Sequence, residues 1–214
     1  MKKFMPLLAI ALITLLSCNN QNKIPENFDF GQVSNGLYTN DYFEMEVHFD
    51  PNWAVQNKEE MNNLIEMGNE LVSEGDEEMK KLIEASKVNT AYLLTVFKYE
   101  VGTPVEFNPS FMIIAENTKN FSRIKDGGDY LVEAKKTLKQ TPMNYSFNKP
   151  VYEKIINNTS YHILEAELSY VGKSITQEYI STVKNGFSLL FTLSYSTEEE
   201  KSELYKVLNK IKMK

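Results

Sequence analysis

The chain is poor in the residues from which most enzyme sites are built. Its 214 residues include one cysteine and two histidines. A lone cysteine cannot form a disulfide within the chain, and His48 and His162 have no metal-binding spacing around them. The sequence also lacks a glycine-rich phosphate loop and a Gly-x-Ser-x-Gly nucleophile elbow. We therefore expect a protein that is not an enzyme and that holds no cofactor.

Positive charge is also in deficit. The chain has 23 lysines and arginines against 29 aspartates and glutamates, a formal net charge of −6. An acidic balance disfavours binding to nucleic acid or to an anionic membrane surface. We expect no nucleic-acid partner, and any attachment to a membrane has to come from a lipid rather than from a basic patch.

The single cysteine stands at the end of a short apolar run. Lys2 and Lys3 precede a mainly apolar stretch over residues 4–16. This stretch is shorter than the roughly 20 apolar residues that span a bilayer. A charged start, a short apolar core and small residues at its end are typical of a secretory signal.

The junction Leu15-Leu16-Ser17-Cys18 resembles the lipobox of bacterial lipoproteins. The resemblance implies a signal peptide over residues 1–17, cleavage before Cys18, and acyl groups such as palmitate on Cys18. Such a chain would be anchored by lipid to a membrane of the bacterial cell envelope, since each buried methylene contributes about 0.8 kcal/mol. The alternative is an ordinary buried thiol, or a signal in which the cysteine is accidental.

Residues 18–35 follow as a polar segment rich in Asn, Gln and Lys with one proline, Pro25. This composition predicts a flexible tether between the lipidated cysteine and a domain over residues 36–214. Phe28 and Phe30 are the exceptions, and the favoured interpretation is that their rings dock on the domain.

Period-two and helical patterns alternate in the first half of the domain. Apolar residues at every second position over 43–49 predict a strand that ends at Pro51, and further strands are expected over 90–99 and 110–116. Helices are expected where side chains can cap free amides: after Asn57 in a capping box with Glu60, after Asp76, and after Asp129.

The pattern in the second half of the domain predicts an antiparallel meander followed by a final helix. Strands are expected near 151–156, 160–171, 174–184 and 187–195. Two-residue turns able to adopt positive φ join them, at Asn157-Asn158, Gly172-Lys173 and Asn185-Gly186. Thr197, followed by three glutamates, opens the last helix.

This order of elements resembles a known family. The residues that carry the likeness are Tyr38, Asn40, Pro51 and Trp53 around the first strand and the run 108–110, Asn-Pro-Ser, before a later one. Together with the meander and closing helix, they resemble the Mog1/PsbP-like domain, which includes bacterial envelope lipoproteins. The resemblance implies an α+β fold, an α/β/α sandwich with a central antiparallel sheet, and a scaffold that binds partners without catalysis.

One group of carboxylates could carry chemistry. A turn at Gly172-Lys173 places Glu167 opposite Glu178, with Glu165 two residues along the same face. Like charges directly opposite are destabilising unless something neutral or positive intervenes. We favour the interpretation that these acids splay into water or pair with lysines.

Two functions remain open. We expect a membrane-anchored binding or assembly module that reaches an envelope protein partner. The alternative is a small-ligand (lipid) carrier or a cation-binding protein that uses Glu165, Glu167 and Glu178. The same strand face carries Ile163, Ile180 and Phe191, which we expect to pack under a helix rather than to line a ligand cavity.

Overall fold

The computed structural model describes residues 23–170 and 172–214. The predicted signal peptide, residues 1–17, and the predicted lipid site, Cys18, lie outside these ranges. None of the helices within the described ranges has the length and apolar character that crossing a bilayer requires.

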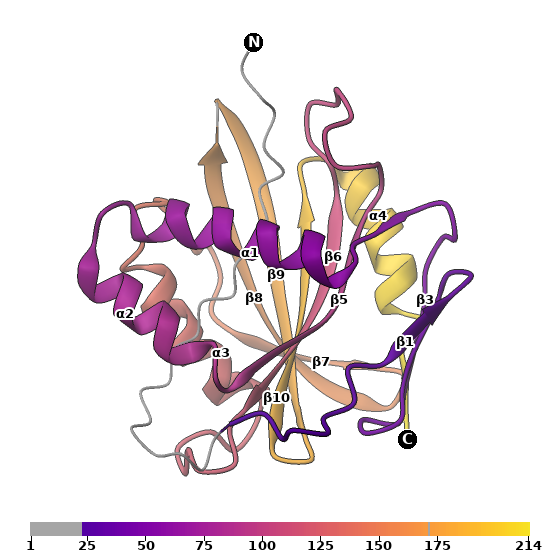
Figure 1. Ribbon diagram of the computed structural model, residues 1–214. Helices are drawn as coiled ribbons and strands as arrows, with labels where there is room; N and C mark the ends of the chain where they lie inside the picture. The colour runs from indigo at the N-terminus through magenta and orange to yellow at the C-terminus, as the bar shows by residue number, and fades with distance from the viewer. Residues whose placement is uncertain (1–22, 171) are drawn as a thin grey trace.

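Two antiparallel sheets form the centre of the domain (Figure 1). The strands of the large sheet, in spatial order, are β4 (Ala54–Val55), β5 (Thr90–Phe97), β6 (Ser110–Asn117), β10 (Phe187–Tyr195), β9 (Lys173–Lys184), β8 (Thr159–Tyr170) and β7 (Tyr152–Ile156). Those of the small sheet are β1 (Gln32–Ser34), β2 (Leu37–Asn40), β3 (Met45–His48) and β11 (Lys212–Met213). The expected α+β class with an antiparallel central sheet is confirmed.

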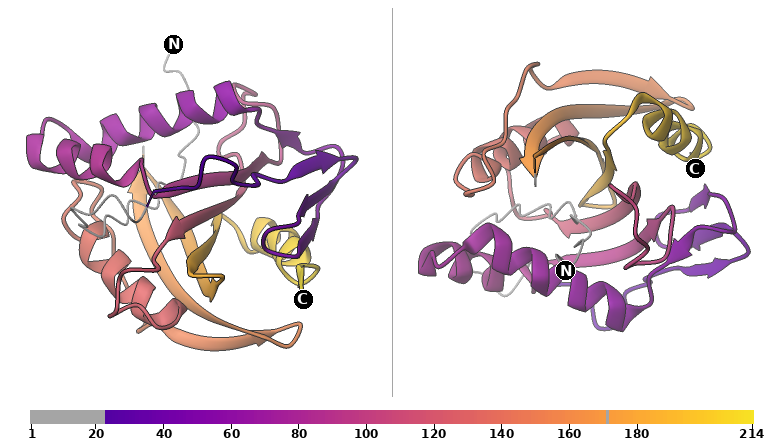
Figure 2. Two further views of the ribbon diagram at one scale, coloured as in Figure 1. Left: turned by 60° about the horizontal axis from the view of Figure 1, so that its bottom comes forward. Right: turned by 90° about the horizontal axis from the view of Figure 1, so that it is seen from above.

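The helices cover both faces of the large sheet. One face carries α1 (Lys58–Ser73) and α3 (Gly127–Leu138), with α2 (Glu77–Ser86) beside α1. The other carries α4 (Glu198–Leu208) and the small sheet. The large sheet curves so that α4 lies on its concave side (Figure 2).

Side chains of β10 show how the two cores are separated. Leu190 points to the α1 and α3 side, whereas Leu189 and Phe191 point to the α4 side, and all three are fully buried. Period-two alternation in a strand covered on both faces therefore distributes apolar residues between two cores. Ile163, Ile180 and Phe191 lie together in the α4 core, so the expectation that they pack under a helix is confirmed.

Local capping chemistry starts the helices. The Asn57 side chain accepts from the amides of Glu59 and Glu60 at 2.9 and 3.1 Å, and Glu60 accepts from the Asn57 amide at 2.8 Å, which confirms the capping box. Asp76 and Thr197 also cap as predicted.

The predicted cap of α3 at Asp129 is wrong by three residues. Asp126 is the cap: its Oδ1 accepts from the amides of Gly128 and Asp129 at 2.8 and 2.9 Å. The first residue of the helix, Gly127, has no room for a larger side chain. A Cβ at this position would lie 2.1 Å from the carbonyl oxygen of Ser181 on β9.

The hairpin turns test the predicted register of the meander. Asn157, Asn158, Asn185 and Gly186 all have positive φ, as expected. The predicted turn at Gly172-Lys173 is wrong. Lys173 is the first residue of β9 and pairs with Tyr170, and Gly172, at φ +79°, occupies the second position of the loop. The shift changes every opposite pair of β8 and β9.

The predicted tether is too long. The amide of Ile24 donates to the Val88 carbonyl at 2.9 Å, and the Asn117 side chain donates to the Lys23 carbonyl at 3.1 Å. Phe28 is 7% exposed, which confirms the docking of its ring, whereas Phe30 is 49% exposed and contacts Phe28 edge-on. Residues 23–35 therefore belong to the domain, because Lys23 and Ile24 are bonded to it and the Phe28 ring packs against Phe43 and Phe187.

Candidate functional site

The three predicted carboxylates do not form one cluster. With the observed register, Glu165 lies directly opposite Glu178, and Glu167 lies opposite Thr176. The backbone of Glu167 is instead bridged to Ser146 by two hydrogen bonds of 2.8 and 2.9 Å. The predicted pair of Glu167 and Glu178 is therefore replaced by a pair of Glu165 and Glu178.

Glu178 is the buried centre of this site. The hydroxyl of Tyr195, at the end of β10, donates to its Oε1 at 2.6 Å, and the hydroxyl of Tyr205, on α4, donates to its Oε2. The ammonium of Lys201, one turn before Tyr205 on α4, lies 3.2 Å from Oε1. Three donors thus satisfy a carboxylate that is only 1% exposed.

Glu165 has a partner of its own. The ammonium of Lys149 lies 3.2 and 3.3 Å from its two carboxylate oxygens. Each of the two facing acids is therefore paired with a lysine, as favoured from the sequence: one lysine precedes β7 and the other lies on α4. Their charges offset the repulsion that two facing carboxylates would otherwise produce.

The tyrosines of this site stay protonated. Burial raises the pKa of Tyr195 and of Tyr205, and the hydrogen bond that each donates to Glu178 raises it further. Tyr152, on β7, has its pKa raised by burial and then by the charge of Glu178. Protonated phenols act as donors to the carboxylate, so this arrangement fastens α4 to β9 and β10.

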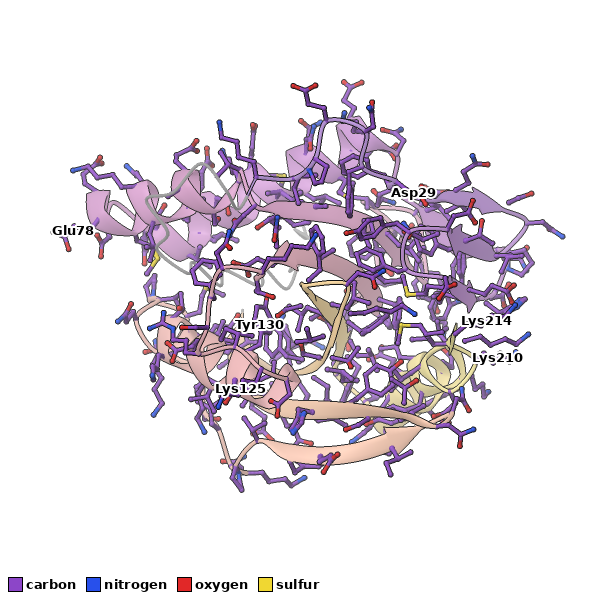
Figure 3. The ribbon with its side chains drawn as sticks, turned by 90° about the horizontal axis from the view of Figure 1, so that it is seen from below. Asp29, Glu78, Lys125, Tyr130, Lys210 and Lys214 are labelled. Carbon is purple, nitrogen blue, oxygen red and sulfur yellow. The ribbon has the colours of Figure 1, made fainter. Side chains whose placement is uncertain are left out.

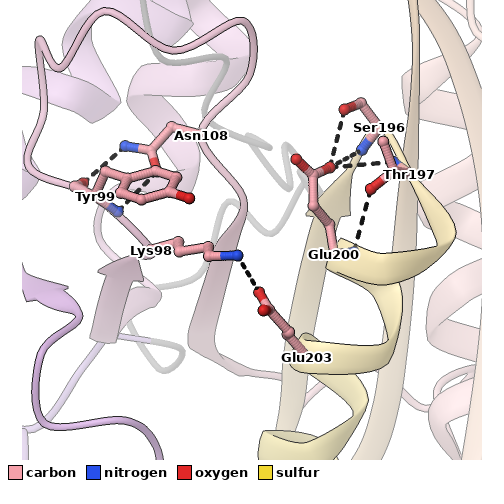
Figure 4. Close-up of polar contacts among 7 residues, drawn as sticks. All are labelled: Lys98, Tyr99, Asn108, Ser196, Thr197, Glu200 and Glu203. Atoms are coloured by element: carbon pink, nitrogen blue, oxygen red, sulfur yellow. Dashed lines mark hydrogen bonds and ion pairs between the residues drawn. The ribbon is translucent and has the colours of Figure 1, made fainter.

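Further polar contacts hold the N-terminal half of α4 (Figure 4). Glu200 accepts from the Ser196 amide at 2.7 Å, the Ser196 hydroxyl at 2.9 Å and the Thr197 amide at 3.1 Å. Glu203 pairs with Lys98, which follows β5, at 2.6 Å, and this bond raises the pKa of Lys98. The figure also shows Asn108, which bonds both the amide and the carbonyl of Tyr99. The motif residue Asn108 thus closes the loop between β5 and β6.

The site has the features of a structural joint rather than of a metal centre. Lys201 occupies the place that a cation would take beside Glu178. Within residues 23–170 and 172–214, no group of three or more acids, histidines or cysteines is placed to hold a metal ion. The two histidines are not brought together: His48 lies in the small sheet, and half-buried His162 lies in β8 beside Gly128.

A second polar group, which sequence reasoning missed, lies in the large sheet on the side of α1 and α3. Ser194 and Gln177 are opposite each other on β10 and β9, and Thr192 is two residues from Ser194. In the described part of the chain, the hydroxyls of Thr192 and Ser194 and the Nε2 of Gln177 are buried without a hydrogen-bond partner. Tyr145 and Tyr179 donate to the Oε1 of Gln177 at 3.1 and 2.6 Å.

The sequence of β10 contains a pattern that could have predicted this buried polar group. Polar residues occupy three of the four even-numbered positions of β10, with Leu190 at the fourth, and the odd-numbered positions from Phe187 to Tyr195 are all apolar or aromatic. Such a pattern normally marks a solvated face, but here the face is buried. A buried donor or acceptor without a partner costs about 1–3 kcal/mol.

Comparison with known proteins identifies the fold. No family model and no curated protein matches the sequence. Among solved structures, the chain is similar to cyanobacterial PsbP (CyanoP) from Synechocystis sp. PCC 6803, with a TM-score of 0.52 and 11% identity over 94% of this chain and 99% of that one. The chain has a PsbP-like fold.

Two other solved structures are more distant. A protein of unknown function from Pseudomonas aeruginosa is 11% identical, with a TM-score of 0.42 over 57% of this chain and 79% of that one. A protein from Bacteroides thetaiotaomicron is 10% identical, with a TM-score of 0.41 over 80% of this chain. The match spans 45% of that protein, less than half its length. At these identities the PsbP-like likeness concerns the fold alone.

Proposed function

We propose that this chain is a lipoprotein of the bacterial cell envelope, held on its membrane through acyl groups on Cys18. Its PsbP-like domain binds another envelope protein and catalyses no reaction. The lipobox sequence before Cys18 supports the anchor. The engagement of Glu165 and Glu178 by Lys149 and Lys201 supports a role for the surface rather than for this buried site.

The observation that carries the binding role is the free edge of the large sheet. Strand β7 is the last strand of the sheet and pairs with β8 on one side only, among the residues that the structure describes. Ile155 in this strand is 71% exposed, more than any other large apolar side chain in the described ranges. An unpaired edge strand offers backbone donors and acceptors to an extended segment of a partner.

Charged side chains on β7 restrict which partner strands can pair with this edge. Lys154 precedes Ile155, and its ammonium lies 4.8 Å from the ring centre of Tyr205. Glu153 lies two residues from Ile155, and its carboxylate accepts from the Ser160 hydroxyl. Charged side chains on an edge strand oppose nonspecific sheet-to-sheet pairing. A partner strand that presents an apolar side chain to Ile155 would be accepted at this edge.

The anchor is tested separately from the binding. Mass spectrometry of the mature protein should show an acylated N-terminal Cys18, and Cys18→Ala should move the protein to the soluble fraction. A variant that still sediments with membranes would refute the anchor.

Binding is tested by affinity capture from detergent-solubilised envelope, with an anchor-only fusion as background. We expect a specific protein to be retained by the wild type, lost with Ile155→Glu, and kept with Val132→Glu. Val132, on α3, is 46% exposed and serves as the matched control. Retention of no protein above background, or equal loss with both variants, would contradict the proposal.

A further inference from the structure

We propose that the domain rests on the bilayer with one end, which we call the basic end, against anionic lipid headgroups. The basic end consists of Lys23, Lys119, Arg123 and Lys125. The inference rests on the proposed anchor at Cys18, and it adds which surface of the domain faces the lipid and what that surface binds.

The first argument is the length of chain between the anchor and the domain. Lys23 and Ile24 are fixed by hydrogen bonds to Asn117 and Val88. Four residues lie between Cys18 and Lys23, and the five Cα–Cα steps from Cys18 to Lys23 span at most about 18 Å when fully extended. The tether predicted to reach residue 35 would have spanned roughly 60 Å and would have left the domain free to turn.

The second argument is the direction of the strands. Lys23 is fastened to the end of β6, and the basic loop between β6 and α3, residues 118–126, leaves from the same end. The amide of Thr118 donates to the Gly186 carbonyl at 3.0 Å, so the hairpin of β9 and β10 lies there too. In Figure 1 this is the lower end of the sheet, and the hairpin of β8 and β9 is at the upper end.

These two ends differ greatly in their distance from the anchor. Strand β9 has 12 residues, Lys173–Lys184. A strand of that length extends roughly 37 Å. Because the linker is at most about half as long, it keeps the basic end close to the bilayer, whereas Gly172 lies at the end of the sheet that is farther from the anchor.

The third argument is charge. Lys23, Lys119, Arg123 and Lys125 are all exposed, in a chain whose formal net charge is −6. The view from below shows Lys125 beside α3 at this end of the molecule (Figure 3). Arg123 lies 4.0 Å from its nearest carboxylate, Glu133. Clustered lysines and arginines near a membrane attract anionic headgroups.

Two acids at the end of the basic loop, Asp126 and Asp129, are already engaged by backbone amides. Asp126 accepts from the amides of Gly128 and Asp129, and Asp129 accepts from the Lys125 amide at 3.0 Å. They lie at the positive end of the α3 dipole, which offsets part of their charge. The net charge of the whole chain led us to expect attachment through the lipid and not through a basic patch, and the proposed contact adds a local basic surface to that anchor.

The experiment uses the acylated full-length lipoprotein in vesicles of phosphatidylcholine with and without phosphatidylglycerol. Once Cys18 is acylated no free thiol remains, so one introduced cysteine is a unique attachment point for a fluorophore. Ser122→Cys labels the basic end, and Ser174→Cys labels the opposite end; both positions are exposed. We expect a quencher on the lipid headgroups to quench the label at residue 122 several-fold more than that at residue 174.

A charge variant tests the headgroup contact. Arg123→Glu with Lys125→Glu should reduce quenching at residue 122 in the vesicles with phosphatidylglycerol and leave it unchanged in those without. Lys58→Glu with Lys139→Glu changes the net charge equally, away from the basic end, and should have no effect. If the charge variant behaves like this control, the anionic contact is refuted.

Flotation of the vesicles separates the two proposals. If the labelled protein does not float with the vesicles, the anchor fails and the orientation fails with it. If it floats and the two labels are quenched equally, or residue 174 more than residue 122, the anchor stands and the orientation is refuted.

Discussion

Lys201 on α4 and Glu178 on β9 form an ion pair whose carboxylate is closed off from water. The Nζ of Lys201 lies 3.2 Å from the Oε1 of Glu178, and the Glu178 side chain is 1% exposed. The hydroxyls of Tyr195 and Tyr205 complete the coordination of this carboxylate. A helix that packs on a sheet through Leu204, Val207 and Leu208 is thereby also fixed in rotation and along its axis.

Removal of the buried carboxylate should be costly. We expect Glu178→Ala to lower the free energy of unfolding by about 3–5 kcal/mol, because it leaves the hydroxyls of Tyr195 and Tyr205 without their acceptor and the half-buried Lys201 without its counter-ion. Urea unfolding followed by circular dichroism measures this. Glu165→Ala is the control and should cost about 1 kcal/mol or less, since its partner Lys149 is 57% exposed. If the two variants lose the same free energy of unfolding, the burial of Glu178 does not increase its contribution to stability.

Alkaline pH should weaken the fold through the same site. Burial raises the pKa of Tyr205 and Tyr195 above the value near 10 that they have when unfolded. The stabilisation is complete below pH 10 and is lost as pH rises from there toward the folded pKa, since the unfolded chain releases protons first. Each such tyrosine should remove about 1.4 kcal/mol between pH 9 and pH 11.

Tyr205→Phe isolates this contribution. The variant should be less stable than the wild type at pH 8, and the difference should shrink by about 1.4 kcal/mol at pH 11. Urea unfolding at both pH values measures it, with absorbance at 295 nm reporting tyrosine ionisation. A difference that stays constant with pH would contradict the raised pKa.

The unpartnered hydroxyls beneath α1 and α3 give a prediction of opposite sign. Thr192→Val keeps the side-chain shape and removes a buried hydroxyl that has no partner among the described residues. We expect it to raise the free energy of unfolding by about 1 kcal/mol. Ser188→Ala, which removes a hydroxyl 3.3 Å from that of Thr118, should lower it. Destabilisation by Thr192→Val would show that a bound water or a polar ligand satisfies this hydroxyl.

The close approach of α3 to β9 should not tolerate a methyl group. Gly127→Ala places a Cβ 2.1 Å from the Ser181 carbonyl, so the start of the helix must move away from the sheet. We expect a loss of about 2 kcal/mol or more in thermal or urea unfolding, in the range of overpacked cores. Val132→Ala, on the exposed side of the same helix, should change little.

Helix starts and turns could be predicted from sequence because their chemistry is local. Asn57, Asp76 and Thr197 bond amides two or three residues away, and Asn185-Gly186 needs only positive φ. The turn at Gly172 failed because one glycine fits either loop position, and the choice shifts the register by two residues across the pair.

The partners of Glu178 could not be predicted. Tyr195, Lys201 and Tyr205 are 17 to 27 residues away along the chain, and they meet Glu178 only because α4 folds back on the concave face. Lys201 and Tyr205 share one face of α4, but the sequence does not indicate which strand that face contacts. The acids of β8 and β9 were recognised, whereas the lysines that neutralise them depend on tertiary packing.

The fastening of residues 28–31 determines how the domain bears a mechanical load. Asp29 accepts from the amides of Gly31 and Asp41, the Tyr38 hydroxyl donates to the Phe30 carbonyl at 3.0 Å, and Asn40 donates to the Asp29 carbonyl at 2.9 Å. A pull on the chain from its N-terminal side acts first on the bonds of Lys23 and Ile24 to Asn117 and Val88, and then on these bonds and the Phe28 ring. Because residues 29–31 are bonded to residues 38–41, part of the force is transferred to the small sheet before it reaches the paired strands of the large sheet.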